Sequence, residues 1–174
     1  MSLLGIGRII NIEPKVVTLN VPYKAIGLSV KTSMKSVFTD LPKLYKKYMS
    51  LKDKFGIPDQ KVPWEYVSLS KNFDEDKTWD YFTGHVVKNT DSMPEMFISF
   101  EIPTCTYAVF PVRPRNKLML GFTIGKMKRI IYNNWLPKSK YEFLGYEFEY
   151  NNEKMFKESP YYIDLYVAVK EKNL

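Results

Sequence analysis

Between Leu41 and Phe55, apolar residues recur every three or four positions, which is the spacing of a helix that buries one face. Asp40 is a candidate N-terminal cap, and Gly56 and Pro58 end the pattern. The apolar positions are Leu41, Leu44, Tyr45, Tyr48, Leu51 and Phe55. Lysines occupy the opposite face, so the pattern predicts an amphipathic helix.

A second segment predicts another long helix, from a cap at Asn116 to Trp135, which Pro137 ends. Its apolar positions are Leu120, Ile124, Met127, Ile131 and Trp135. Gly121 and Gly125 each weaken this helix by about 1 kcal/mol relative to alanine. Because they lie four residues apart, we expect them to allow close packing of the helix on the sheet.

The remaining apolar runs are rich in β-branched and aromatic residues and are typical of strands. They cover residues 16–31, 64–71, 79–89, 95–113, 141–150 and 161–171. Pro22 interrupts the first run and Pro103 the fourth, because proline cannot donate a hydrogen bond to a neighbouring strand.

The order strand, helix, strand, strand occurs over residues 15–90 and again over residues 95–172. A chain of 174 residues suits a single domain, here residues 1–174. We therefore predict an α+β fold of two duplicated βαββ units, with antiparallel sheets and two long helices, related by a pseudo-twofold axis. The seam between the halves would form a groove, which is a favoured place for a ligand.

Composition and charge narrow the class of partner. The net charge of +7 comes from scattered lysines with no nucleic-acid-binding signature, which favours a solvated surface over direct nucleic-acid binding. The apolar stretch 2–12 contains Arg8 and is shorter than the roughly 20 residues that span a bilayer. It also lacks a signal-peptide cleavage site. We expect no membrane partner and, with Cys105 as the lone cysteine, a cytoplasmic location.

The residues that usually carry catalysis are scarce. With one histidine, His85, and one cysteine, the sequence predicts neither a metal site nor a disulfide framework. It has no Gly-rich phosphate loop and no Gly-x-Ser-x-Gly elbow, so we expect no cofactor. An enzymatic function would have to rest on glutamate, tyrosine and water. Tyrosine is abundant, at 13 residues, and suits a pocket with apolar walls and polar tips.

Two carboxylates stand out in the strand-like segment 146–150. Side chains alternate along a strand, so Glu147 and Glu149 share one face and the aromatic residues between them share the other. One interpretation is that both glutamates point to water. The other is that a glutamate lies on the floor of an aromatic groove, where it would attract a cation.

Several short motifs, in this order, resemble the GyrI-like superfamily, which includes the effector-binding domains of AraC-type and multidrug-sensing transcription regulators. The motifs are Tyr-Ala-Val-Phe at 107–110, Trp-Leu-Pro at 135–137, Ser-Lys-Tyr-Glu at 139–142, Phe-Glu at 148–149 and Ile-Asp-Leu-Tyr-Val-Ala-Val at 163–169. The resemblance is close over 102–170 and looser over 15–89. The segment before Lys15 is too short for a helix-turn-helix, so the chain looks like a stand-alone module.

The resemblance implies a duplicated βαββ fold with a ligand groove between the halves, and a glutamate of the second half that meets a cationic or aromatic ligand. That glutamate corresponds to Glu149, or to Glu147 in another register. The tyrosine usual two residues later is Asn151 or Glu149 here, which leaves the ligand class open. The candidate wall residues are Trp64, Tyr66, Trp79, Tyr81, Tyr107 and Tyr166.

Three functions fit this resemblance. The first is a small-molecule-binding module for lipophilic, aromatic cations, acting as a regulator's effector domain or as a drug-sequestering protein. The second is a hydrolase of strained-ring genotoxic compounds that uses Glu149 as general acid or base. The third is a gyrase-inhibitor-like module that binds a protein partner such as a topoisomerase or a regulator.

Overall fold

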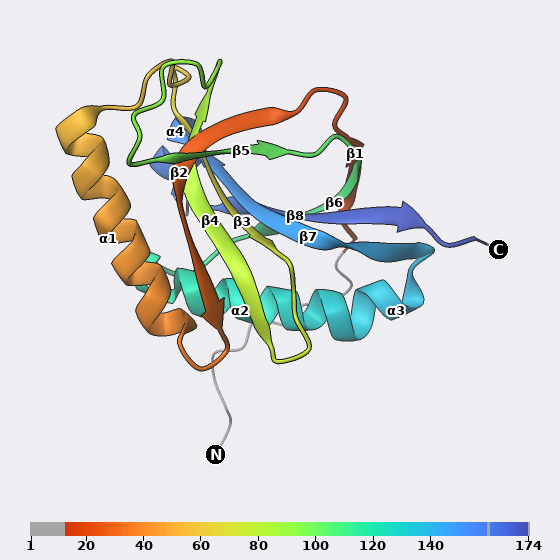
Figure 1. Ribbon diagram of the computed structural model, residues 1–174. Coiled ribbons are helices and arrows are strands. Elements are labelled where there is room, and N and C mark those ends of the chain that lie inside the picture. The colour runs from red at the N-terminus through yellow and green to blue at the C-terminus, as the bar shows by residue number, and fades with distance from the viewer. Residues whose placement is uncertain (1–12, 160, 174) are drawn as a thin grey trace.

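The computed structural model describes residues 13–159 and 161–173, and it contains one antiparallel sheet with helices packed on it (Figure 1). The strands are β1 (Lys15–Thr18), β2 (Tyr23–Ser33), β3 (Glu65–Lys71), β4 (Thr78–Val87), β5 (Ile98–Ile102), β6 (Thr106–Val112), β7 (Tyr141–Asn152) and β8 (Ile163–Glu171). The helices are α1 (Val37–Phe55), α2 (Leu120–Ile130), α3 (Leu136–Lys138) and α4 (Glu153–Lys157).

The strand order is β1-β6-β8-β7-β3-β4-β2-β5, with every neighbouring pair antiparallel. The fold is therefore α+β, as the sequence predicted. Outward from the β3–β7 pair, the strands follow the order β3, β4, β2 on one side and β7, β8, β6 on the other. Each half of the chain therefore contributes three of the six central strands, in the same order, to one continuous sheet. This order agrees with two βαββ units, although their duplication stays a prediction.

Both long helices pack on the same face of the sheet. Leu28, Thr83, Ser68, Glu149, Leu165 and Phe110 are directly paired from strand to strand, and they form one row across six strands. Directly opposed residues share a face. The β2 end of this row packs against α1, where Leu28 shares a buried cluster with Leu44 and Tyr48. The β6 end packs against α2, where Phe110 shares a cluster with Ile124. Figure 1 shows the two helices beside the sheet.

The opposite face of the sheet carries a separate core. Its buried residues include Val67, Phe82, Tyr107 and Phe148, and residues near β1 and β5 pack against them. Gly27 of β2 and Gly84 of β4 are directly paired. A Cβ on Gly27 would lie 1.9 Å from the Thr83 carbonyl oxygen, so both positions require glycine.

The largest differences between the predicted and observed element boundaries are at two strands and one helix. The predicted strands 16–31 and 95–113 are each two strands, because the chain turns around Pro22 and Pro103. The first helix begins at Val37 rather than at Asp40, whose carboxylate instead accepts a hydrogen bond from Thr32 Oγ1 at 2.8 Å.

The second helical segment begins where the sequence predicted. The side chain of Asn116 accepts the Met119 backbone N–H at 3.1 Å, and a 3-10 turn at Lys117–Met119 leads into α2. The helix then passes through one π turn, Ile131–Trp135, before α3.

The expectation that Gly121 and Gly125 pack closely on the sheet is wrong. A Cβ added to either glycine would meet nothing within 4 Å. The sheet-facing side of α2 instead carries Ile124 and Met127, which pack into the core under β6 and β8. The two glycines therefore leave open space beside the helix.

Candidate ligand-binding site

A cavity of about 720 Å³ lies between α1 and the start of α2, over the central strands of the sheet. Its floor is formed by β3, β4 and β7, so both halves of the chain contribute to it. The residues that line it are Leu41, Pro42, Tyr45, Met49, Lys52, Gln60, Trp64, Tyr66, Ser68, Tyr81, Thr83, His85, Lys117, Leu120, Gly121, Glu149, Asn151, Phe156 and Ile163.

Aromatic rings form one wall of this cavity and hold one another in place. The Tyr66 ring lies 6.4 Å from that of Tyr45, edge to face. The Trp64 ring lies 5.9 Å from that of Phe156, also edge to face. Tyr45 and Phe156 are about half exposed, with 53% and 45% of their surface accessible, so they lie at the mouth. Such rings offer flat apolar faces with a negative centre, which attract cations as well as aromatic groups.

The polar groups of the floor are largely satisfied by one another. The Tyr66 hydroxyl lies 2.6 Å from Thr83 Oγ1, which lies 2.9 Å from Ser68 Oγ. Ser68 and Thr83 are direct partners of β3 and β4 in the row described above, and Tyr66 lies two residues before Ser68 on the same face. A cavity whose hydroxyls already have partners favours an apolar ligand over one rich in hydrogen-bonding groups.

Two side chains are exceptions. The Oδ1 of Asn151, which also lines the cavity, is buried and has no hydrogen-bond partner in the described part of the chain. The other exception is a carboxylate. Glu149 projects from β7 into the cavity, directly beside Ser68, and only 19% of its side chain is exposed. Burial raises the pKa of the Glu149 carboxyl, the ammonium of Lys128 opposes this, and the nearby Glu147 adds to it. The Lys128 Nζ lies 3.5 Å from Glu149 but 2.6 Å from Glu147. Two carboxylates therefore share one ammonium, and Glu149 is the less closely paired of the two.

Glu147 is almost fully buried, two residues before Glu149 on the same face of β7. It accepts a hydrogen bond from the Tyr132 hydroxyl as well as its ion pair with Lys128. Tyr132 lies in the π turn that follows α2. Such turns often occur at functional sites, because they redirect side chains that a regular helix would place elsewhere.

His85 lies at the back of the cavity, where it is buried and hydrogen-bonded. Its Nδ1 is 2.6 Å from the Tyr48 hydroxyl, which also accepts the His85 backbone N–H at 3.1 Å. Burial lowers the pKa of His85 to about 4, with a smaller contribution from the charge of Lys52. The imidazole is therefore neutral at physiological pH and adds no positive charge to the site.

The structure divides the eight residues proposed from the sequence into three groups. Glu149, Trp64, Tyr66 and Tyr81 line the cavity together. Glu147 and Trp79 line a smaller neighbouring cavity of about 350 Å³. Tyr107 and Tyr166 lie on the opposite face of the sheet, around Phe148. Glu149 is paired with Leu165, so the next residue, Tyr166, points away from it.

Sequence reasoning missed the part of the site that the helices provide. The helical spacing predicts that Tyr45 is part of a buried stripe, yet it lies at the edge of that stripe and faces the cavity. The scattered lysines predict a solvated surface that would include Lys128, because nothing in the sequence shows which lysine of a helix faces a carboxylate across the fold. The pattern of apolar residues around Phe156 likewise does not indicate that this side chain lines a cavity.

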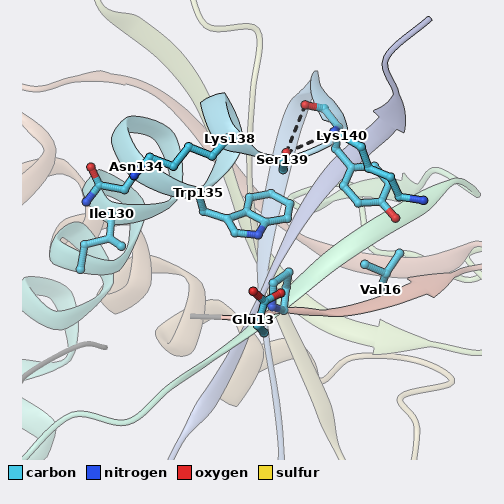
Figure 2. Close-up of a pocket in the computed structure, with 10 residues that line it drawn as sticks. Glu13, Val16, Ile130, Asn134, Trp135, Lys138, Ser139 and Lys140 are labelled. Carbon is cyan, nitrogen blue, oxygen red and sulfur yellow. Dashed lines mark hydrogen bonds between the residues drawn. The ribbon is translucent and has the colours of Figure 1, made fainter. Parts of the chain in front are cut away.

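Another cavity, of about 580 Å³, lies between the end of the second helical segment and β1 (Figure 2). Trp135 borders it, but its ring stacks on Tyr141 and packs edge to face on Phe110, 5.1 Å between ring centres. Its charged lining residues, such as Glu13 and Lys138, are exposed. Without a buried charged group, this cavity lacks the combination of an aromatic wall and a buried carboxylate that the cavity between α1 and α2 has.

Two features are absent from the described residues, 13–159 and 161–173. No helix there has the length and apolar character needed to cross a membrane. Within the same residues, no three His, Cys, Asp or Glu side chains gather as metal ligands would.

Comparison with known proteins identifies relatives of this fold. Residues 19–169 match the model of the Cass2 family, described as integron-associated effector binding protein. No curated protein matches the chain. The family model and the solved structures below support the superfamily assignment made from the sequence.

Three solved structures share the fold. SAV2435 bound to tetraphenylphosphonium has a TM-score of 0.69 and 10% identity, over 91% of this chain and 94% of that chain. An integron cassette protein from the mobile metagenome of Vibrio cholerae has a TM-score of 0.59 and 10% identity, over 90% and 95%. A protein of Staphylococcus aureus MU50 described as a bacterial transcription regulation protein has a TM-score of 0.60 and 10% identity, over 92% and 99%.

Proposed function

Because the chain belongs to the Cass2 family of integron-associated effector binding proteins, we propose that it binds lipophilic aromatic cations in the cavity between α1 and α2. The observation that carries the proposal is the surplus carboxylate, Glu149, on the floor of an aromatic cavity. With both carboxyls ionised, Glu147, Glu149 and Lys128 together hold two negative charges and one positive charge. A monovalent cation would neutralise the group.

The wall residues would add to this attraction. A cation whose charge is spread over a large apolar ion is weakly hydrated, so its transfer out of water costs little free energy. Such a cation can lie against the rings of Trp64, Tyr66 and Tyr45. Each such contact contributes roughly 0.5–2 kcal/mol. The tetraphenylphosphonium bound to SAV2435 is a ligand of this class, which favours the same chemistry here.

We further propose that the binding serves to sense or sequester an effector in the cytoplasm. The family description favours an effector-binding role. The Staphylococcus aureus neighbour, described as a transcription regulation protein, favours a regulatory context. The thiol of Cys105 is free, in keeping with a reducing compartment.

The test is a calorimetric titration with two ions of the same shape, tetraphenylphosphonium and tetraphenylborate. The cation should bind and the anion should bind at least tenfold more weakly. Gly121→Trp should abolish cation binding, because Gly121 lines the cavity and the space beside it is open. Gly125→Trp is the matched control, since Gly125 lies one turn further along α2 with the same open space but does not line the cavity.

Equal binding of the two ions, or undiminished cation binding by Gly121→Trp, would refute the proposed site. Mass spectrometry of the recovered ligand adds a second readout. A binding protein returns the compound unchanged, whereas a hydrolase that uses Glu149 would return a strained-ring compound with water added.

A further inference from the structure

Lys128 is held between the two carboxylates of β7 rather than extended into solvent. Its Nζ lies 2.6 Å from Glu147 and 3.5 Å from Glu149, and only 25% of its side chain is exposed. Tyr132 donates a hydrogen bond to Glu147 and so holds the carboxylate that Lys128 contacts more closely. Lysine is seldom buried to this degree without such partners.

The same ammonium stands where two cavities meet. The larger cavity lies over Ser68 and Glu149, and the smaller one lies over Ser70 and Glu147. These are successive same-face pairs of β3 and β7. Because Lys128 contacts both carboxylates, it lies at the boundary, and it also lines the smaller cavity.

We propose that Lys128 is the specificity-determining residue of this site: it is a built-in cation that competes with the ligand for Glu149 and restricts the site to ligands with a single positive charge. This inference rests on the proposed function. Within this cluster, two carboxylates and one ammonium leave room for one further positive charge. Lys52 and Lys117 also line the cavity, but they form no ion pair with either carboxylate. A dication would leave an uncompensated charge in a buried place, which is costly.

The charge count predicts opposite changes in ligand preference for two variants, one that removes Lys128 alone and one that also removes the charge of Glu147. Lys128→Met keeps the apolar stem and removes the ammonium, so two carboxylates face the ligand and a dication becomes acceptable. Lys128→Met combined with Glu147→Gln leaves Glu149 as the single charge. This double variant should again prefer a monocation, and should bind it more tightly than the wild type because no internal ammonium competes.

The experiment compares two ligands with the same two-ring framework, 1-methyl-4-phenylpyridinium with one charge and methyl viologen with two. The wild type should prefer the monocation by at least tenfold. Lys128→Met should reduce this ratio at least tenfold, and the double variant should restore it while binding the monocation at least tenfold more tightly than the wild type. Lys126→Met, which removes one charge from the same helix but forms no ion pair with these carboxylates, should leave the ratio unchanged.

The outcomes separate the two proposals. If the wild type binds neither cation, the proposed function fails and this inference fails with it. If the wild type binds the monocation but the ratio is the same in Lys128→Met, only the role of Lys128 is refuted. Should Lys128→Met not fold, the double variant decides, since unchanged monocation affinity in it overturns competition by Lys128.

Discussion

Glu149→Gln tests the floor of the cavity most directly, because the change removes a charge and keeps the shape of the side chain. A cation about 4 Å from a carboxylate gains about 4 kcal/mol at an effective dielectric constant of 20. Lys128, 3.5 Å from Glu149, already neutralises part of that charge and reduces the gain. We therefore expect a loss between about 1.4 and 4 kcal/mol, or tenfold to roughly a thousandfold in affinity for tetraphenylphosphonium.

The assay is a titration that follows tryptophan fluorescence, because Trp64, one of the three tryptophans, lines the cavity. Glu65→Gln is the matched control, because Glu65 has a similar exposure of 21%, pairs with Lys61 and lies outside this cavity. Tetraphenylborate should show the reverse change, binding more tightly to Glu149→Gln than to the wild type. Equal affinity of the wild type and Glu149→Gln for the cation, with both proteins folded, would refute the reasoning.

Two further predictions concern pH. Cation affinity should fall on acidification, and the fall should begin above the pH at which an ordinary glutamate titrates, because burial raises the pKa of Glu149 and the protonated form no longer attracts a cation. Calorimetric titrations between pH 8 and pH 5 check this, since the pKa of His85 is about 4 and its ring stays largely neutral over that range. The free energy of unfolding should also fall between about pH 6.5 and pH 4, by at most about 3 kcal/mol, because the unfolded chain takes up a proton on His85 that the folded chain resists down to a pKa of about 4. Urea unfolding measures the fall, and a His85→Gln variant that keeps the same pH dependence would contradict the assignment.

The order of elements followed from the sequence because local patterns determine it. The helical spacing around Tyr48 and the alternation around Phe148 are properties of neighbouring residues, and both were recovered in the structure. Alternation also placed Glu147 and Glu149 on one face, as the register of β7 against β3 confirms.

The composition of the site could not be predicted in the same way, because it depends on pairing between distant strands. Tyr166 follows Leu165 by one residue, and only the pairing of Leu165 with Glu149 decides that the tyrosine points to the other face. The position of Lys128 depends on how α2 crosses β7, which no local pattern records. Residues that share a strand could thus be grouped by alternation alone. The set expected across strands was divided: Trp64, Tyr66 and Tyr81 line the cavity with Glu149, whereas Tyr107 and Tyr166 lie on the other face.

The β3–β7 pair has a consequence for how the molecule holds together. Ser68 and Glu149 are direct partners across the line where the first half of the chain meets the second. Most of the aromatic wall comes from one half and the carboxylate from the other, so neither half alone has a complete cavity. A ligand bound there contributes its free energy only while the halves stay joined, about 2.7 kcal/mol at a concentration one hundred times Kd. Ligand binding in the cavity and association of the two halves are therefore linked equilibria, so each favours the other.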